Sequence, residues 1–260
     1  MSEASVVVTI EGQVAIVRLN EPTSMNALSA GIRETLTREI PRLLDDPAVR
    51  CLVITGTGAA FCAGGDIRNM REERPKGTRE RMRRHYDGWT RRLLKAEKPV
   101  VMAVNGAAAG AGVSLALMGD ILVASREAYF TTAFARLGAV PDLGLVATLP
   151  RAVGMARARD MLLTSRKVPA EEALQMGLVA RVVEPDQLMP TVIEAAHDLA
   201  SSPTVTLGLI KRLLQRAYDP SFDEYLEAEG FAQAVAMSTD DFREGVAAFR
   251  EKRRPKFRGS

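Results

Sequence analysis

The length, composition and charge of the chain are those of a globular protein with one large domain, or with one domain and an appendage. Of its 260 residues, 47% are hydrophobic and 26% are charged, and only 13 are prolines. This balance excludes a disordered or fibrous protein, and a typical domain has about 150 residues. The formal net charge of +3 is too close to balance to indicate nucleic-acid binding by itself.

Cysteine, histidine and hydropathy patterns exclude further classes of protein. Cys51 and Cys62 are too few for a disulfide framework, which favours a reducing compartment. Residues 1–11 lack the basic and apolar segments of a signal peptide, and no membrane-length apolar run occurs, so we expect a cytoplasmic protein. His85 and His197 lie far apart without other ligands at metal-binding spacing, so neither a zinc site nor a Ser-His-Asp triad is expected.

The first part of the chain predicts two strands, a helix and a third strand. Residues 6–10 and 13–19 are β-branched runs separated by a tight turn, which is typical of a hairpin. Apolar residues at helical spacing predict a helix over 30–44, and Ser29 can cap it. The apolar run 50–55 predicts a buried strand.

The middle of the chain begins with the one real cluster of charge. Residues 68–98 are rich in arginine and are expected to be mostly helical. A second buried strand is predicted over 100–104, and the small and apolar residues 107–118 predict a buried helix. Repeated strand, strand, helix units of this kind indicate an α/β protein. The shorter elements expected next are strands at 121–124 and 129–130, a loop at 140–144 and a helix near 145–153.

The last third of the chain is predicted to be mainly helical. A helix is expected to begin after Pro169 and to end at Gly177, followed by a last strand over 178–183. Helices are expected from residue 188 onward. We place a boundary near residue 195, between a core of residues 1–195 and a helical region of residues 196–260. The stretch 240–257 is amphipathic and is expected to pack on another surface.

Two glycine-rich turns each follow a predicted buried strand. They are residues 60–66 (AFCAGGD) and 105–112 (NGAAAGAG). Small residues let a ligand approach backbone N–H groups, and a helix beginning near Ala111 would direct its positive end to the same place. Two such N–H groups that converge would form an oxyanion hole. The alternative is that the glycines serve only close packing and tight turns. Neither turn matches a phosphate-binding loop or a dinucleotide fingerprint.

Together with other motifs, these turns resemble the enoyl-CoA hydratase/isomerase family, also called the crotonase superfamily. The resemblance implies an α/β fold: a ClpP/crotonase-like spiral of repeated β-β-α units, followed by a C-terminal helical trimerisation region. It implies homo-oligomers, either trimers or pairs of trimers, and acyl-CoA thioester substrates whose coenzyme A is part of the substrate, with no separate cofactor and no metal. The other matching segments cover nearly the whole chain: 19–28 (LNEPTSMNAL), 98–100 (KPV), 149–154 (LPRAVG), 173–183 (ALQMGLVARVV) and 248–253 (AFREKR).

The resemblance also implies catalytic roles. Members hold the thioester oxygen between two backbone N–H groups, and the matching residues are Gly65 and Ala111. Hydratases use two glutamates at positions that here hold Ser114 and Phe134, neither of which can act as a general base. Isomerase-like members keep a carboxylate eight residues later, where this chain has Asp142. One carboxylate suffices to move a proton within an enoyl-CoA or a related CoA ester. The alternative for Asp142 is an ordinary turn or helix N-cap.

Further contacts are implied by matching positions. Arg68 and Lys252 suit phosphate groups, although each can equally belong to a solvated basic face. We interpret Asp66 as bonding the backbone of its turn, and Cys62 as a buried filler rather than a nucleophile. The implied substrate contacts are Ala63, Gly65, Asp66, Ile67, Arg68, Ala111, Ser114, Phe134 and Leu143, and the implied coenzyme A contacts are Met25, Ala27, Arg68, Phe249 and Lys252.

Isomerisation is therefore the favoured activity, and other functions stay open. They are hydration of enoyl-CoA in fatty-acid or aromatic-acid degradation, dehalogenation by an aspartate nucleophile without the usual helper residues, and silent binding of CoA thioesters. The basic segment 68–98 could bind RNA, but only Tyr86 and Trp89 interleave its charges, so we interpret it as a solvated face or a lid. We expect neither a membrane nor a nucleic acid as a partner.

Overall fold

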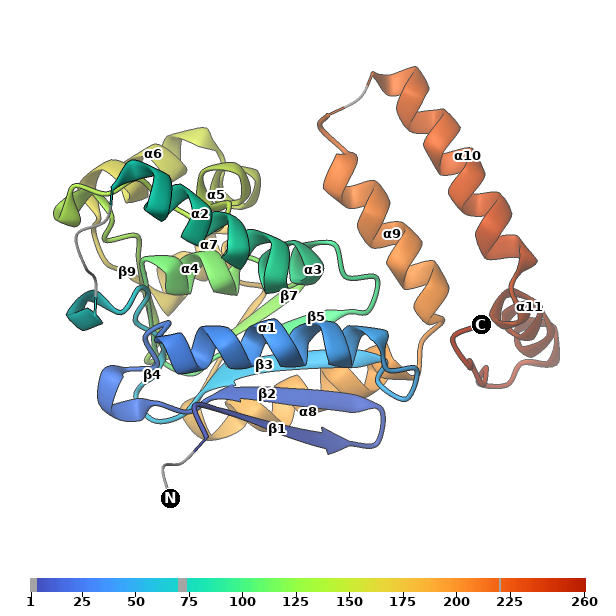
Figure 1. Cartoon of the computed structure of the whole chain (residues 1–260). Helices are drawn as coiled ribbons and strands as arrows, with labels where there is room; N and C mark the ends of the chain where they lie inside the picture. Colours follow the sequence, from blue (N-terminus) through green and yellow to red (C-terminus); the bar gives the residue numbers. More distant parts are fainter. Residues whose placement is uncertain (1–3, 70–73, 220) are drawn as a thin grey trace.

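The computed structural model describes residues 4–69, 74–219 and 221–260. Two β-sheets with helices around them form the core, and a C-terminal run of helices extends from one side of it (Figure 1). We call residues 204–260 the helical arm. No helix within the described ranges is long and apolar enough to cross a membrane.

The larger sheet has six strands in the order β1-β2-β3-β5-β7-β10. Strands β1 and β2 pair antiparallel, which confirms the predicted hairpin, and all other neighbours pair parallel. Strands β3 and β5 are buried along their whole length, as their continuous apolar sequences predict. The strands are β1 (Val6–Glu11), β2 (Val14–Leu19), β3 (Cys51–Gly56), β5 (Val100–Val104), β7 (Ile121–Ser125) and β10 (Arg181–Val183).

The smaller sheet has four strands in the order β4-β6-β8-β9. The chain alternates between the sheets, because β3 is followed by β4, β5 by β6 and β7 by β8. Strands β4, β6 and β8 run parallel to one another, with Cys62 opposite Ala108 and Ala108 opposite Phe130. This alternation is the predicted spiral of β-β-α units. The strands are β4 (Ala60–Cys62), β6 (Ala107–Ala109), β8 (Tyr129–Thr131) and β9 (Val168–Pro169).

The predicted continuous helix over 107–118 is wrong. Its first residues form strand β6, which pairs with β4 on one side and with β8 on the other. Gly110 then takes a positive φ of 51°, and helix α4 (Ala111–Ala116) begins after it. Small apolar residues fit a buried strand as well as a buried helix, so sheet pairing decides which one forms.

Helices cover both faces of the larger sheet. Ser29 accepts a hydrogen bond from the N–H of Ile32 and caps α1 as predicted. Helix α8 packs on strands β2, β3, β5 and β7, and its apolar face completes a second hydrophobic cluster. Residue 195, the expected domain boundary, lies within this helix. The remaining helices of the core are α1 (Ala30–Asp45), α5 (Leu145–Val153), α6 (Met155–Thr164), α7 (Ala170–Met176) and α8 (Leu188–Ala200), with short 3-10 turns η1 (Pro22–Ser24), η2 (Ile67–Asn69), η4 (Ala135–Leu137) and η5 (Pro185–Gln187).

The arginine-rich segment is helical where the structure describes it. Helix α2 (Pro75–His85) continues into a π-helical turn, η3 (Tyr86–Thr90), and then into α3 (Arg91–Leu94). Residues 70–73 of the predicted segment lie outside the described residues. Trp89 is fully buried, whereas most of the arginines of this segment face solvent. We call the helical residues 75–94 the roof. Their charged side chains face solvent, and their aromatic and apolar side chains anchor them on the core.

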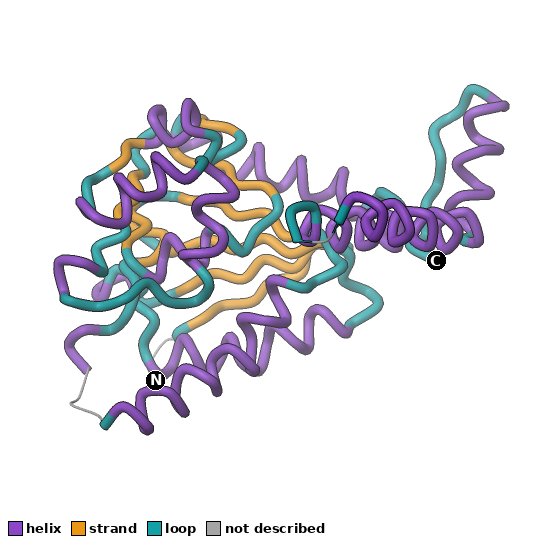
Figure 2. Tube along the Cα trace, turned by 90° about the horizontal axis from the view of Figure 1, so that it is seen from above, coloured by secondary structure: helices purple, strands orange, loops and turns teal. Residues whose placement is uncertain are grey.

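The helical arm consists of α9 (Thr204–Arg216), α10 (Phe222–Ser238) and α11 (Asp240–Glu251). Figures 1 and 2 show that it extends away from the two sheets. It exposes several large apolar side chains: Leu214, Tyr218, Phe222, Phe231 and Phe249.

Several charged contacts join the arm to the core, and two of them hold its first helix. The guanidinium of Arg50, next to β3, donates hydrogen bonds to the hydroxyl of Thr204 at 2.9 Å and to the carbonyl of Phe257 at 3.0 Å. The Nζ atom of Lys211 lies 2.6 Å from a carboxylate oxygen of Asp120, just before β7. The start of the arm is thus held firmly, while its outer helices keep their apolar faces in solvent.

Candidate active site

Three segments of the predicted site leave the smaller sheet at the same edge. The first glycine-rich turn follows β4, the second follows β6, and the loop 132–144 follows β8. Because these three strands are parallel neighbours in close register, their carboxyl ends lie side by side. Ligands of parallel sheets bind at such an edge. The segments that carry Gly65 and Asp142, two residues some 80 positions apart in the chain, therefore both leave the sheet at this edge.

The two glycine-rich turns are in direct contact. A Cβ atom at Gly112 would lie 2.0 Å from the carbonyl oxygen of Cys62. A Cβ atom at Gly64 would lie 3.1 Å from the amide nitrogen of Ala111 and would strain a backbone with a φ of 94°. Close packing is therefore a real function of these glycines, as the alternative interpretation holds. The same close packing also brings the backbones of the two turns into contact with each other.

Two amide groups at this contact are available to a ligand. Within the described residues, the N–H groups of Gly65 and Ala111 donate no hydrogen bond. Their neighbours are held in place, since the N–H of Leu28 donates to the carbonyl of Gly64 at 2.7 Å and the N–H of Gly110 donates to the carbonyl of Thr131 at 2.8 Å. An unused N–H pair on a rigid backbone can bind a negatively charged oxygen.

The side chain of Asp142 lies in the third segment and is largely buried. Its Oδ1 atom is inaccessible to solvent and has no hydrogen-bond partner among the described residues. Burial raises the pKa of this carboxyl above its ordinary value, and a hydrogen bond from its own backbone N–H and the nearby Arg81 partly oppose the rise. Helix α5 begins after Gly144 without a side-chain cap, so Asp142 does not serve as its N-cap. A largely buried carboxyl with one oxygen atom that has no hydrogen-bond partner among the described residues is a group that a substrate can use.

The two positions occupied by glutamates in hydratases hold groups that do not ionise. Ser114 is buried within α4, and its hydroxyl has no partner among the described residues. Phe134 directs its ring toward the second turn, with Cζ at 4.0 Å from the place a Cβ of Gly110 would occupy. Both residues therefore lie next to the second turn, and neither supplies an acid or a base.

Tyr86, at the start of the π-helical turn, is a site neighbour that sequence reasoning did not assign. Burial and the nearby Asp142 raise the pKa of its phenol, while a hydrogen bond from the backbone of Leu143 lowers it. The roof therefore reaches the loop that carries Asp142. The sequence analysis allowed this segment to be a lid, but it did not single out Tyr86, because an aromatic residue among arginines is also typical of a helix that merely anchors on the core.

Most of the implied coenzyme A contacts lie near the first turn. Arg68 and Ile67 are exposed in η2, and the N–H of Ala63 donates to the carbonyl of Met25 at 2.9 Å. Ala27, which follows the same segment, is buried. Phe249, by contrast, is 86% exposed on α11, and Lys252 directly follows that helix. In both whole-chain views α11 lies far from η2 (Figures 1 and 2), so one chain does not bring the two sets together.

Two side chains of the first turn, Cys62 and Asp66, lie in surroundings that indicate structural roles. Burial raises the pKa of the Cys62 thiol to about 12, so it is not a thiolate near neutral pH. Both cysteines are buried and unpaired. Asp66 acts on the guanidinium of Arg33 in α1, which ties the turn to that helix electrostatically. These observations agree with the interpretation of Cys62 as a filler.

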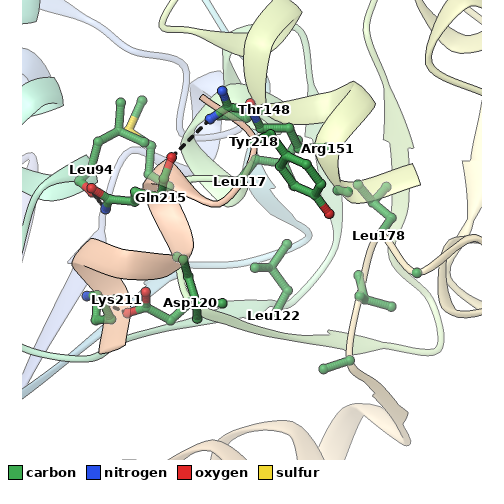
Figure 3. A pocket seen from close by; sticks show the side chains of 17 residues that line it. Leu94, Leu117, Asp120, Leu122, Thr148, Arg151, Leu178, Lys211, Gln215 and Tyr218 are labelled. Carbon is green, nitrogen blue, oxygen red and sulfur yellow. Dashed lines mark hydrogen bonds and ion pairs between the residues drawn. The ribbon is translucent and has the colours of Figure 1, made fainter. Parts of the chain in front are cut away.

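A cavity of about 620 Å³ lies elsewhere, between α9 and the core. Figure 3 shows Lys211 beside Asp120 on one side of it, with Arg151 and Tyr218 on the other. None of the predicted site residues lines this cavity. It belongs to the attachment of the arm, and the chemistry of the side chains places the candidate site at the edge of the smaller sheet instead.

Comparison with known proteins agrees with this geometry. Residues 9–260 match the profile of the family described as enoyl-CoA hydratase/isomerase. The chain is 40% identical to the 1,2-epoxyphenylacetyl-CoA isomerase of Escherichia coli (strain K12), over 96% of this chain and 97% of the relative. It is 38% identical to a probable enoyl-CoA hydratase of Rhodobacter capsulatus, over 100% of both chains. The solved structure of an enoyl-CoA hydratase/isomerase from Cupriavidus metallidurans superposes with a TM-score of 0.93 at 34% identity, covering 100% of this chain and 98% of that one.

The protein belongs to the enoyl-CoA hydratase/isomerase family, and its fold is the crotonase fold that the motifs predict. It is accordingly an acyl-CoA enzyme of this family.

Proposed function

We propose that the enzyme isomerises an enoyl-CoA or a related CoA ester with a single carboxylate. The observation that carries this proposal is the state of Asp142, whose Oδ1 atom is buried without a hydrogen-bond partner among the described residues, in the loop that leaves the same sheet edge as the two glycine-rich turns. Ser114 and Phe134 leave no second carboxylate at the positions that hydratases use. The 1,2-epoxyphenylacetyl-CoA isomerase of Escherichia coli, a relative over nearly the whole chain, supports the same reaction class.

In this mechanism the thioester oxygen lies between the N–H groups of Gly65 and Ala111. Asp142, as carboxylate, takes a proton from C2 of a 3-enoyl-CoA. The negative charge spreads to the thioester oxygen, where each N–H donor contributes about 3 to 4 kcal/mol of stabilisation. The same carboxyl then returns the proton to C4, and the double bond moves to C2–C3. A raised pKa suits this role, because the group must both accept and release the proton near neutral pH.

Hydration is the second candidate, favoured by the name of the Rhodobacter capsulatus relative. Water addition needs one group to activate water and another to protonate the substrate. With a hydroxyl at position 114 and a phenyl ring at position 134, Asp142 would have to do both. The isomerase mechanism needs only the one carboxylate and therefore ranks first.

We also propose that the protein acts as a homo-oligomer, a trimer or a dimer of trimers, in the cytoplasm. The arm exposes a row of large apolar side chains in the single chain, and such patches mark protein contacts. Helix α11, which carries Phe249 and ends at Lys252, lies on the opposite side of the molecule from η2 (Figures 1 and 2), which supports a coenzyme A site shared between copies. In the proposed oligomer a neighbouring copy supplies them.

Mass-spectrometric measurement of deuterium incorporation, with product analysis, tests the reaction. Wild-type enzyme would be incubated in D₂O with 3-enoyl-, 2-enoyl- and arylacetyl-CoA thioesters. A shifted double bond or a rearranged ring, lost in Asp142→Asn and kept in Asp198→Asn, supports the single-carboxylate mechanism, and deuterium in the product reports exchange of the carboxyl proton with solvent before its return. Asp198 is an exposed aspartate on α8 and serves as the matched control. Water addition would establish the hydratase, and tight binding without exchange would indicate a silent binder.

A further inference from the structure

The chain reverses direction at the end of α11 and runs back along that helix. Lys252 takes a positive φ of 54° there, and its N–H and that of Arg253 donate to carbonyls in the last turn of α11. We call residues 253–260 the return segment. The guanidinium of Arg253 lies 2.6 and 2.9 Å from the two carboxylate oxygens of Glu244, earlier in the same helix. Phe249 and Lys252, the implied coenzyme A contacts on the arm, therefore lie at the reversal.

Two carboxylates on α11 hold the backbone of the return segment. Glu244 accepts a hydrogen bond from the N–H of Lys256 at 2.7 Å. The two oxygens of Asp241 accept one N–H each, from Arg258 at 2.6 Å and from Gly259 at 2.7 Å. Asp241 is only 3% exposed, so these N–H groups replace water around its charge. Because such bonds are lost when the atoms separate by about 1 Å more, they fix the course of the return segment along α11.

Arg50 extends the same restraint to the core. It directly precedes β3 in the larger sheet and is only 5% exposed. Its guanidinium donates to the carbonyls of Phe257 and Ser202 and to the hydroxyl of Thr204. A Cβ atom at Gly259 would lie 3.2 Å from Nε of Arg50, so the return segment passes directly over the guanidinium. The segment is thus held between a buried carboxylate on α11 and a buried guanidinium on the core.

From this arrangement we infer that Arg50, Asp241 and Glu244, here called the clasp, are positioning residues for coenzyme A binding. They fix the reversal of the chain and therefore the place where Lys252 is presented. Lys252 is exposed and forms no ion pair among the described residues, so its ammonium group is available to a phosphate. A binding group on a rigid support loses less conformational freedom when its ligand arrives. This inference rests on the proposed function, in which a neighbouring copy supplies Phe249 and Lys252.

The alternative is that the clasp contacts only keep the arm folded. A purely structural role would affect the binding of all CoA-like ligands alike, or of none. A positioning role affects only ligands that carry the nucleotide part of coenzyme A, because that part bears the phosphates Lys252 would contact. The two roles can therefore be separated by comparing ligands with and without the nucleotide.

Binding of two saturated thioesters makes this comparison without any turnover. Butyryl-CoA and butyryl-pantetheine share the acyl group and the pantetheine arm, and only butyryl-CoA carries the nucleotide. The dissociation constant of butyryl-pantetheine divided by that of butyryl-CoA, measured calorimetrically on the full-length protein, is the nucleotide ratio. Lys252→Gln should lower this ratio about 10-fold. Asp241→Asn and Arg50→Lys should each lower it about fivefold or more and leave butyryl-pantetheine binding within about twofold.

The variants are chosen to keep size or charge. In Asp241→Asn the amide nitrogen cannot accept a backbone N–H, so one of the two bonds is lost. In Arg50→Lys the charge stays, but an ammonium group cannot reach all the acceptors of the guanidinium. Asp240→Asn is the matched control and should keep the wild-type ratio, because Asp240 is exposed and pairs with Arg243 within α11. If Asp241→Asn does not fold, Arg50→Lys decides alone.

A double variant shows whether the clasp acts through Lys252. Asp241→Asn added to Lys252→Gln should change the nucleotide ratio by less than about twofold, since the side chain being positioned is already gone. A further loss as large as that in the wild-type background would overturn the inference. Light scattering on each variant measures the assembly. If the ratio falls only where the oligomer dissociates, the clasp serves assembly alone and the inference is wrong.

The proposals fail separately in these experiments. A wild-type ratio in Lys252→Gln would refute the proposed coenzyme A contact and the inference with it. A lowered ratio in Lys252→Gln, with the wild-type ratio in Asp241→Asn and Arg50→Lys, would refute the clasp and keep the contact. Neither result bears on the proposed isomerisation, because both thioesters are saturated and only their binding is measured.

Discussion

Two regions of the site are built in opposite ways. One is the pair of glycine-rich turns, and the other is the charged side, which consists of the loop 132–144 and the roof. The turns are buried, contain few side-chain functional groups and are positioned by contacts that leave no room for a Cβ. The charged side consists of long or ionisable side chains, and among the described residues the Oδ1 atom of Asp142 and the Nε2 atom of His85 are buried there without a hydrogen-bond partner. Backbone geometry can therefore persist while the chemistry beside it changes, since exchanging a side chain on the roof or loop does not disturb the sheet edge.

The strongest test of this contrast is Asp142→Asn. The amide keeps the size of the side chain but cannot accept the C2 proton, so kcat/KM for isomerisation should fall about 100- to 10,000-fold. Folding should be retained, and because a buried carboxylate is costly to ionise, the melting temperature at pH 7 should not fall. Steady-state kinetics and calorimetry measure both. A variant with full activity would remove Asp142 from the mechanism.

Gly112→Ala tests the other side of the comparison. The added Cβ would meet the carbonyl of Cys62 at 2.0 Å, and neither backbone can move without disturbing the sheet edge. We expect a loss of about 1 to 3 kcal/mol of stability, or more, from overpacking, along with a loss of activity. Denaturant unfolding measures it. Gly230→Ala in α10, where no atom lies within 4 Å of the new Cβ, is the control and should be neutral or stabilising by up to about 1 kcal/mol.

The pH dependence of the reaction should report the environment of Asp142. Because burial raises its folded pKa, the catalytic carboxylate is lost at a higher pH than for an ordinary aspartate. The acid limb of kcat/KM should therefore lie above 3.8, the ordinary value. The same raised pKa affects the free energy of unfolding. Between the ordinary pKa of 3.8 in the unfolded chain and the higher pKa in the folded chain, the unfolded chain has already released this proton, so stability falls as pH rises through this interval. An acid limb at the ordinary value or below would contradict the burial.

Ser114→Ala should have the smallest effect. Its hydroxyl has no partner within the described residues, so its removal breaks no hydrogen bond. We expect kcat/KM to change by about threefold at most. A loss approaching that of Asp142→Asn would show that the turn region does contribute side-chain chemistry, and the contrast between the two regions would fail.

The sequence alone predicted correctly those elements whose residues favour only one kind of secondary structure. The continuous apolar runs of β3 and β5, the cap at Ser29 and the stop at Gly177 belong to this group. The family and its fold also followed from motifs spread along the chain, and the comparisons confirm them. Residues 107–109 were assigned to a helix wrongly, because small apolar residues carry no preference strong enough to outweigh pairing with two neighbouring strands.

What only the tertiary structure decided is how the parts of the site meet. Parallel pairing of β4, β6 and β8 brings both turns and the Asp142 loop to one edge, and no local pattern encodes a contact between segments so far apart in the chain. Tertiary structure also decides that Asp142 Oδ1 and His85 Nε2 have no hydrogen-bond partner among the described residues, and that burial and neighbouring groups shift the pKa of both side chains. The sequence determined which groups are present, and packing determined which of them are left available to a substrate.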